Sequence, residues 1–131
     1  MKQEEKRINW LLKDLCGRLP YKVKVKYYDS EDERDSVDVI EGCEGMDTNN
    51  PRFYIGQYSL SVDEIKPYLF PLSSMTDKQH KEYSKTLIYS KKDECFHTTI
   101  DSFEWFNANH FDCRNLIGKK LAIDCTNLNI Y

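Results

Sequence analysis

A chain of 131 residues has the length of one domain and can bury most of its apolar surface in a single core. Its 40% hydrophobic and 31% charged residues are ordinary for a soluble globular protein, and no apolar run resembles a signal peptide or a membrane span. The net charge of −3 argues against general DNA binding, because the basic surface that phosphates attract is missing overall.

Charge is unevenly spread along the sequence. Residues 1–28 carry eight Lys and Arg against three Asp and Glu, residues 29–47 carry one against nine, and residues 48–131 carry ten of each. An acidic chain of this kind can still bind nucleic acid through a local basic face. The five cysteines are widely spaced without a CxxC pair, which indicates reduced thiols and a cytoplasmic protein.

The first predicted element is an amphipathic helix over residues 1–19. Gly17 and Pro20 are the kinds of residue that end a helix, and in this order. Because so short a helix is not stable alone, its apolar face must pack against the rest of the chain. The apolar residues that recur with helical spacing are Ile8, Leu11, Leu12, Leu15 and Leu19.

A small antiparallel sheet of three to five strands is predicted over residues 20–72. Its first strand, Tyr21–Tyr28, alternates lysines with apolar residues, as a half-buried strand does. The acidic segment Asp29–Asp35 has no apolar residue and is expected to be an exposed loop. Further strands are expected around Val37–Cys43 and Phe53–Tyr58.

Turn and helix-cap residues divide the remainder of the predicted sheet region, residues 46–72. Met46–Pro51 has strong turn chemistry, and Gly56 indicates a bulge or a close approach. Ser61 with Glu64 predicts a capping box for one helical turn, after which a proline-rich extended segment follows. The order helix, strands, one turn and strand would suit an SH3-like small barrel, although this is an analogy between folds.

Residues 73–125 are predicted to be mainly helical. Thr76 with Gln79 forms a capping box for a helix whose apolar face includes Leu87 and Ile88, before a polar break at Lys91–Glu94. A second helix is expected to begin with Asp101 as its N-cap and Glu104 three residues later.

The end of the chain is predicted to be short and compact. We expect a brief turn from Asp112 that Gly118 ends in the left-handed conformation, a final strand near Ile123, and a partly ordered tail over residues 126–131. The prediction is therefore one α+β domain over residues 1–131, with an N-terminal helix, a small antiparallel sheet and a helical C-terminal part.

Nine Tyr, six Phe and two Trp are an unusually high aromatic content for a chain of this length. These rings can fill a small core, or they can form a binding surface beside cationic side chains. Such a surface would suit a host protein or a small nucleotide, because rings stack on bases and cations hold phosphates. The candidate binding residues are Tyr27, Tyr54, Tyr58, Tyr68, Trp105, Arg114, Lys119 and Lys120.

The lysine face of the first strand supports an alternative. Lys22, Lys24 and Lys26, together with Tyr28, form a ridge that would bind single-stranded nucleic acid on a small barrel. Solvation of an exposed sheet face explains the same lysines without a ligand. A structural homo-oligomer, joined through the leucine face of the first helix, is a third hypothesis.

One pattern resembles a metal site. Cys95 and His97, with His110 and Cys113, would supply four nitrogen and sulfur ligands for structural zinc, but the first pair is more closely spaced than usual. Buried thiols and a histidine at a helix end explain the same residues without a metal. The sequence has no G-x-S-x-G, HExxH or P-loop motif. We therefore predict a non-enzymatic protein without a cofactor.

Three segments carry a resemblance to a known family: LKDLCGRLPYKVKVKY, VDEIKPYLFPLSSMT and WFNANHFDCRNLIGKKLAID. Together they resemble a family of small proteins from gut Bacteroidales and their phages and mobile elements, over about two thirds of the chain. The family has no established activity, so the resemblance implies an intracellular accessory protein of phage or host and no catalytic residue. The family pattern has an aromatic residue where this chain has Cys113.

Overall fold

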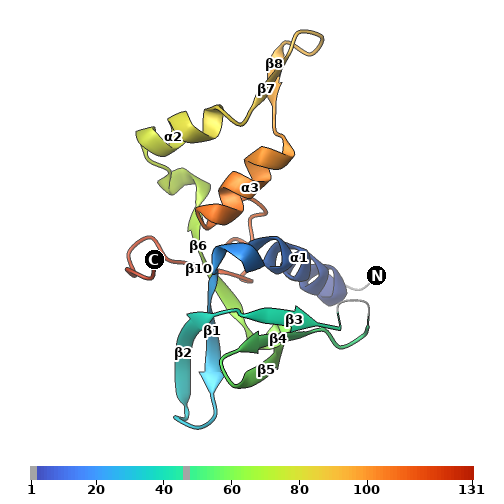
Figure 1. Ribbon diagram of the computed structural model, residues 1–131, viewed down its shortest axis with the longest axis vertical. Helices are drawn as coiled ribbons and strands as arrows, with labels where there is room; N and C mark the ends of the chain where they lie inside the picture. Colours follow the sequence, from blue (N-terminus) through green and yellow to red (C-terminus); the bar gives the residue numbers. More distant parts are fainter. Residues whose placement is uncertain (1–2, 46–47) are drawn as a thin grey trace.

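The structure is a computed structural model that describes residues 3–45 and 48–131. It has a mixed α+β fold, which confirms the predicted class. The molecule is elongated (Figure 1), with α1 above two small sheets at one end and α2, α3 and a β-hairpin at the other. Strand β6 runs between these two ends.

Helix α1 (Gln3–Arg18) confirms the predicted N-terminal helix. Leu11 and Leu15 are buried in the core, as the helical spacing predicted. Gly17 lies inside the helix, and the chain then turns through a 3₁₀ helix, Leu19–Tyr21. Lys22, with a left-handed φ of 56°, ends that turn and directs the chain into the first strand.

The main sheet combines antiparallel and parallel pairs. Its order is β10 (Ile123–Asp124), β6 (Lys66–Pro71), β1 (Lys24–Asp29) and β2 (Arg34–Val39), and β9 (Phe111–Asp112) also pairs with β6. The β1 pairs are antiparallel, whereas β9 and β10 run parallel to β6. The predicted antiparallel sheet over residues 20–72 is confirmed, and the C-terminal segment adds two short parallel strands beside β6.

The acidic loop is shorter than predicted. Arg34 and Asp35 belong to β2 and pair with Asp29 and Tyr28, so only residues 30–33 form the turn of a hairpin. All residues from 30 to 35 are exposed, which explains how a charged segment can form part of an edge strand.

A second sheet lies beside the first and has the order β3 (Gly42–Glu44), β4 (Arg52–Ile55) and β5 (Tyr58–Ser61). The predicted strand over Phe53–Tyr58 is two strands, because Gly56 adopts a φ of 56° in the turn between β4 and β5. The alternating side chains of β4, Phe53 and Ile55, are fully buried between α1 and the sheets. Burial of each contributes about 1.5–3 kcal/mol.

The helical end is built from short elements. The capping box of Ser61 and Glu64 is confirmed at the 3₁₀ turn Val62–Glu64, and a further 3₁₀ turn, Leu72–Ser74, follows β6. Helix α2 (Asp77–Ser84) begins at the predicted capping box of Thr76 and Gln79. It ends before Leu87 and Ile88, so these residues are not part of its apolar face.

Between α2 and helix α3 (Ile100–Ala108) the chain forms a two-stranded hairpin, β7 (Ile88–Ser90) and β8 (Cys95–His97). The prediction of Asp101 as the N-cap of α3 was wrong. Thr99 caps the helix and forms a capping box with Ser102.

Between β9 and β10 the left-handed residues are Asn115 and Lys120 and not Gly118, which corrects a further prediction. Throughout the described ranges, no helix combines the length and apolar character that crossing a bilayer requires.

Candidate functional site

Five large, exposed apolar side chains lie on the β7–β8 hairpin and on α3, and three of them, Ile88, Phe96 and Ile100, are the most exposed among the described residues. We call this set the apolar protrusion. Its members, with their exposed fractions, are Ile88 (63%), Tyr89 (51%), Phe96 (64%), Ile100 (78%) and Phe103 (44%). Large apolar side chains gathered on one part of a surface typically mark a site of interaction with another molecule.

The hairpin extends away from the rest of the protein (Figure 1). Tyr89 and Phe96 are directly opposite each other in its register, with ring centroids 5.2 Å apart and an edge-to-face angle of 60°. Ile88 is opposite His97 and therefore lies on the other face. Both faces of the hairpin thus present large side chains to the solvent.

The base of the hairpin is held by hydrogen bonds. The Thr99 hydroxyl donates to the Thr86 carbonyl over 2.8 Å, and the hydroxyls of Thr86 and Ser102 lie 2.9 Å apart. Ser102 is fully buried. These contacts join the entry and exit of the hairpin to the first turn of α3, so the apolar protrusion has a fixed support.

Aromatic rings join the two helices beneath this support. Tyr83 of α2 lies with its ring centroid 4.8 Å from Phe106 and 5.8 Å from Trp105 of α3. Trp105 also stacks on Phe111, at 5.5 Å and an interplanar angle of 8°. Trp105, a predicted ligand-binding ring, therefore packs within the fold.

The apolar protrusion has no clear signal in the sequence. Strands of three residues are too short for a convincing alternation, and Ile88 also fits the helical spacing that continues from α2. The turn Lys91–Glu94 has no Gly, Asn or Pro to mark it as a hairpin connection. One signal for a hairpin is nevertheless present, because Ile88, Tyr89 and Phe96 lie on either side of four charged residues.

The predicted nucleotide-binding tyrosines lie mainly in the sheets. Tyr27 and Tyr58 pack against each other at 5.8 Å, and the Tyr58 hydroxyl donates to Asp29 over 2.6 Å. Tyr68 is buried in β6, and Tyr54 is half-buried in β4. Burial leaves little of these rings for stacking on a base.

The predicted cations lie on the loop after β9, where Arg114 and Lys119 already have partners. Arg114 Nε lies 3.6 Å from the Asp14 carboxylate, and Lys119 Nζ donates to the Arg114 carbonyl over 2.9 Å. Lys119 Nζ also lies 4.4 Å from the centre of the Trp10 ring, whereas Lys120 is exposed. Two of the three predicted cations are therefore already engaged within the fold.

A groove of about 630 Å³ runs between the end of β6 and the loop after β9. Arg114 is the predicted binding residue that lines it, beside Leu72, Cys113 and the buried Asp112. The Asp112 carboxylate accepts hydrogen bonds from the amides of Leu116 and Ile117, at 2.8 and 2.9 Å, so it shapes this loop.

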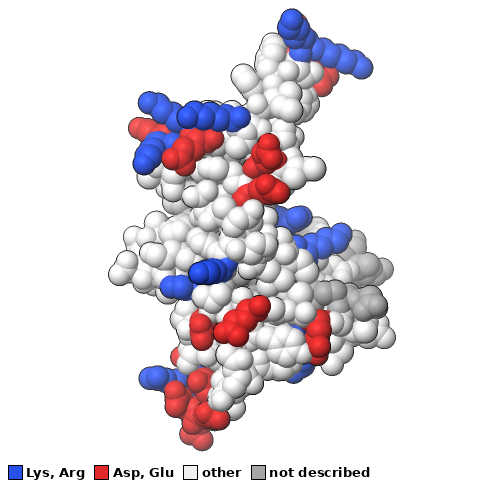
Figure 2. Space-filling view, viewed as in Figure 1, with Lys and Arg blue, Asp and Glu red and all other residues white. Residues whose placement is uncertain are grey.

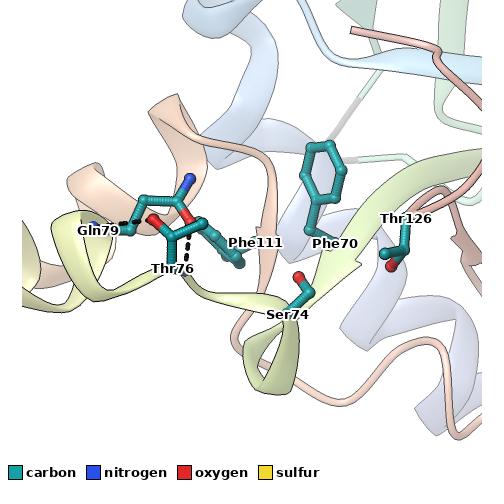
Figure 3. Close-up of a pocket in the computed structure, with 6 residues that line it drawn as sticks. All are labelled: Phe70, Ser74, Thr76, Gln79, Phe111 and Thr126. Atoms are coloured by element: carbon teal, nitrogen blue, oxygen red, sulfur yellow. Dashed lines mark hydrogen bonds between the residues drawn. The ribbon is translucent and has the colours of Figure 1, made fainter.

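A smaller pocket of about 240 Å³ lies between α2 and the C-terminal segment (Figure 3). Thr76 and Gln79 line it but are engaged in the capping box of α2, and the Ser74 hydroxyl donates to the Pro71 carbonyl over 2.7 Å. Because these polar groups are already hydrogen-bonded within the fold, the pocket offers few groups to orient a ligand.

The lysine ridge proposed for nucleic acid is only partly formed. Lys24 Nζ donates to the Ile130 carbonyl over 2.7 Å, and Lys26 Nζ lies 3.3 Å from the Asp35 carboxylate. Lys22 precedes the strand, while Tyr28 is 56% exposed. Lys26 and Tyr28 line a pocket of about 180 Å³ whose other charged residues are Asp35, Asp63, Glu64 and Lys66. This mixture of charges weakens its attraction for phosphate.

The predicted zinc ligands do not come together. His97 Nε2 lies 2.9 Å from Asp93 and 3.7 Å from the Cys95 sulfur, within the hairpin. His110 and Cys113 flank β9, on the other side of α3 in the chain. In residues 3–45 and 48–131, no three His, Cys, Asp or Glu side chains are grouped so that they could hold a metal ion.

A buried polar cluster lies between α1 and β9. Asp14 and Arg18 are almost fully buried and form two hydrogen bonds, of 2.6 and 3.1 Å, while Arg18 Nη2 donates to the Phe111 carbonyl over 2.6 Å. His110 stacks on Tyr131 with ring centroids 3.7 Å apart. Burial, with the nearby charges of Arg18 and Lys24, lowers the pKa of His110 to about 4, so its imidazole is neutral at pH 7.

Tyr131 connects this cluster to the main sheet. Its hydroxyl donates to the Tyr68 carbonyl and accepts from the Lys24 amide, both over 2.9 Å. Burial raises the pKa of Tyr131 to about 12. The tail is therefore more firmly packed than predicted, because the phenol bridges β1 and β6.

Comparisons with protein-family models, with curated proteins and with solved structures found no match to this chain.

Proposed function

We propose that the protein is a non-enzymatic binding module that holds a partner protein on the apolar protrusion. The observation that carries this proposal is the exposure of five large apolar side chains on one hairpin and the adjoining helix. A two-stranded hairpin with both faces in water is marginally stable, so a partner that covers it would gain from burying these side chains.

The charges around the apolar protrusion indicate the kind of partner. Figure 2 shows basic side chains reaching outward at the top of the molecule, where the turn of the hairpin contributes Lys91 and Lys92. Asp93, in the same turn, is already bound to His97. A complementary partner would have an apolar groove with acidic side chains at the end that receives the turn.

The resemblance to proteins of phages and mobile elements supports a host protein as this partner. The small-nucleotide hypothesis has less support, because its candidate rings are buried or half-buried and two of its three cations are already engaged. The same is true of single-stranded nucleic acid, since Lys24 and Lys26 have partners within the chain.

Photo-crosslinking in the native host tests the proposal. A photoreactive phenylalanine analogue at Phe96 should give one defined adduct with a partner protein. The matched control places the same analogue at Tyr28, a ring of similar exposure on β1, and should not give that adduct. The substitution Ile100→Lys should reduce the adduct at position 96 at least tenfold, because a central apolar contact is replaced by a charge.

Three results would contradict the proposal. One is the same set of adducts from positions 96 and 28, which would indicate random collision. Another is the absence of an adduct at position 96 in a protein whose circular dichroism shows the native fold. An adduct of twice the chain mass would replace the host protein by a second copy as the partner, and would equally contradict a host protein.

A further inference from the structure

The side chain of Tyr131 lies in a slot formed by β1, β6 and the residue before β9. We call the four residues that form it, Lys24, Tyr68, Phe70 and His110, the ring slot. The Tyr131 ring stacks on the His110 imidazole, with centroids 3.7 Å apart and an interplanar angle of 9°. Phe70 contacts the same ring at a tilt, with 6.0 Å between centroids, and Lys24 Nζ lies 5.7 Å from its centre. Such contacts are typical of sites that bind aromatic ligands.

The polar end of the ring slot suits a hydroxyl group. The Tyr131 hydroxyl donates to the Tyr68 carbonyl and accepts from the Lys24 amide, both over 2.9 Å. A hydroxyl oxygen can donate and accept at once, whereas a carboxylate can only accept. Burial raises the pKa of Tyr131 to about 12, so the phenol in the slot is neutral at pH 7. The ring slot therefore has the shape and the polar groups to select a neutral phenol.

The segment that carries Tyr131 into the slot is weakly held. Residues 126–129 are all exposed, and Asn129 adopts a left-handed φ of 52° that is uncommon outside glycine. Beyond it, Lys24 Nζ donates to the Ile130 carbonyl over 2.7 Å. Tyr131 itself is 39% exposed. Because an exposed segment loses little burial when it detaches, Tyr131 can leave the ring slot while the core stays packed.

The pocket of about 240 Å³ between α2 and the C-terminal segment adjoins the ring slot. Phe70 lines this pocket (Figure 3) and also contacts the Tyr131 ring. The pocket has few polar groups to orient a ligand, and the ring slot supplies them. A ligand whose phenol ring lies in the slot can therefore extend past Phe70 and gain contacts that Tyr131 lacks.

His110 adds an unused polar group to this arrangement. Its Nδ1 is buried and has no hydrogen-bond partner among the described residues. Buried polar atoms normally have a partner, so the wall of the slot offers a position that the chain itself does not use.

We propose that the ring slot is a binding site for a small phenol, and that Tyr131 is its tethered occupant. A free phenol enters when Tyr131 leaves, and it competes with the tethered ring for the same contacts. The proposal goes beyond the binding of a partner protein, since no residue of the ring slot belongs to the apolar protrusion.

The test uses 4-methylphenol, which is the tyrosine side chain closed by a hydrogen atom. The full chain and its Tyr131→Ala variant are titrated with this probe and followed by NMR, with contacts from the probe to Phe70 and His110 as the evidence for its position. Tyr131→Ala should bind the probe at least about tenfold more tightly than the wild type, because the tethered ring competes at a millimolar effective concentration or higher. In the wild type the same contacts should appear at higher probe concentrations.

Thermal unfolding provides a second readout. At a concentration about tenfold above its Kd, the probe should raise the Tm of Tyr131→Ala by roughly 5 °C, because it binds only the native state.

Two controls define the specificity. Toluene lacks the hydroxyl, so it should bind Tyr131→Ala at least about fivefold more weakly than 4-methylphenol does. Tyr28→Ala removes a tyrosine of β1 that is 56% exposed and lies outside the slot. This variant should bind the probe no more tightly than the wild type.

Several outcomes would overturn the proposal. They are equal affinities of the wild type and Tyr131→Ala, toluene binding as tight as that of 4-methylphenol, or a titration without contacts to Phe70 and His110. If Tyr131→Ala does not fold alone, the probe should restore its circular dichroism spectrum, and a failure to do so would also overturn the proposal. None of these results affects the crosslinking at Phe96, so the two proposals fail separately.

Discussion

The buried pair Asp14–Arg18 allows a prediction whose size can be worked out from the structure. Both side chains are shielded from water, at 2% and 0% exposure. Arg18 shares two hydrogen bonds with Asp14 and one with the Phe111 carbonyl. Asp14 has a second cationic neighbour, Arg114, whose Nε is 3.6 Å away and whose side chain is 42% exposed. The two partners should therefore respond differently to removal of the other.

Asp14→Leu should destabilise the protein by about 3–5 kcal/mol, because the guanidinium stays buried without its carboxylate. Arg18→Met should cost less, about 2–3 kcal/mol, since Arg114 still faces the remaining carboxylate. The double variant Asp14→Leu/Arg18→Met should lose only about 1 kcal/mol. It removes both buried charges and leaves the Phe111 carbonyl as the unsatisfied group.

Urea unfolding followed by circular dichroism measures these differences, provided that the m-value stays constant. The control is Asp35→Asn, which removes an exposed pair with Lys26, at 42% and 60% exposure, and should change the free energy of unfolding by less than about 1 kcal/mol. A double variant less stable than Asp14→Leu would refute the reasoning, as would a loss below about 1 kcal/mol for Asp14→Leu itself.

Substitutions at three further positions test other contacts. Tyr131→Phe keeps the ring but removes the hydroxyl that bridges β1 and β6. The free energy of unfolding, measured by chemical denaturation, should therefore fall by about 1–2 kcal/mol. An unchanged denaturation midpoint would contradict the bridge. The pKa of His110, about 4 instead of 6.5, means that the unfolded chain binds a proton that the native chain does not. The free energy of unfolding should therefore fall by about 1–2 kcal/mol as pH decreases from 7 to 4.5. His110→Asn should reduce this pH dependence in a series of unfolding curves. Asparagine suits the position because it tolerates the left-handed φ of 61°. Asp112→Ala should lower the free energy of unfolding, measured by calorimetry, by about 2 kcal/mol, because two backbone amides lose their acceptor. Asp112→Asn keeps one acceptor oxygen and should lower it by less.

The elements that the sequence predicted well are those specified by neighbouring residues. Thr76 with Gln79, and Ser61 with Glu64, form their capping boxes within four residues, and both boxes are present. The same local reasoning placed the N-cap of α3 at Asp101, which was wrong. Thr99 takes that position because its hydroxyl also donates to the Thr86 carbonyl, a contact across the hairpin that local sequence does not reveal.

The candidate site was harder to predict because exposure is a property of the whole fold. Trp105 and Phe96 are both large rings in the C-terminal half, yet Trp105 stacks on Phe111 and Phe96 is 64% exposed. No local pattern distinguishes the two. The same limit applies to Tyr68, which the sequence offers as a ligand ring and the fold buries in β6.

Strand β6 pairs with β1 at Lys66 and Pro67, with β10 at Tyr68 and Leu69, and with β9 at Phe70 and Pro71. During synthesis, β1 is available as soon as β6 emerges, whereas the two parallel partners are made only after residue 110. A nascent chain therefore carries β6 with most of its amide and carbonyl groups unpaired until the last segment arrives. Closing these long loops sets a slow final step in folding, and a chaperone that shields this strand would act in that interval.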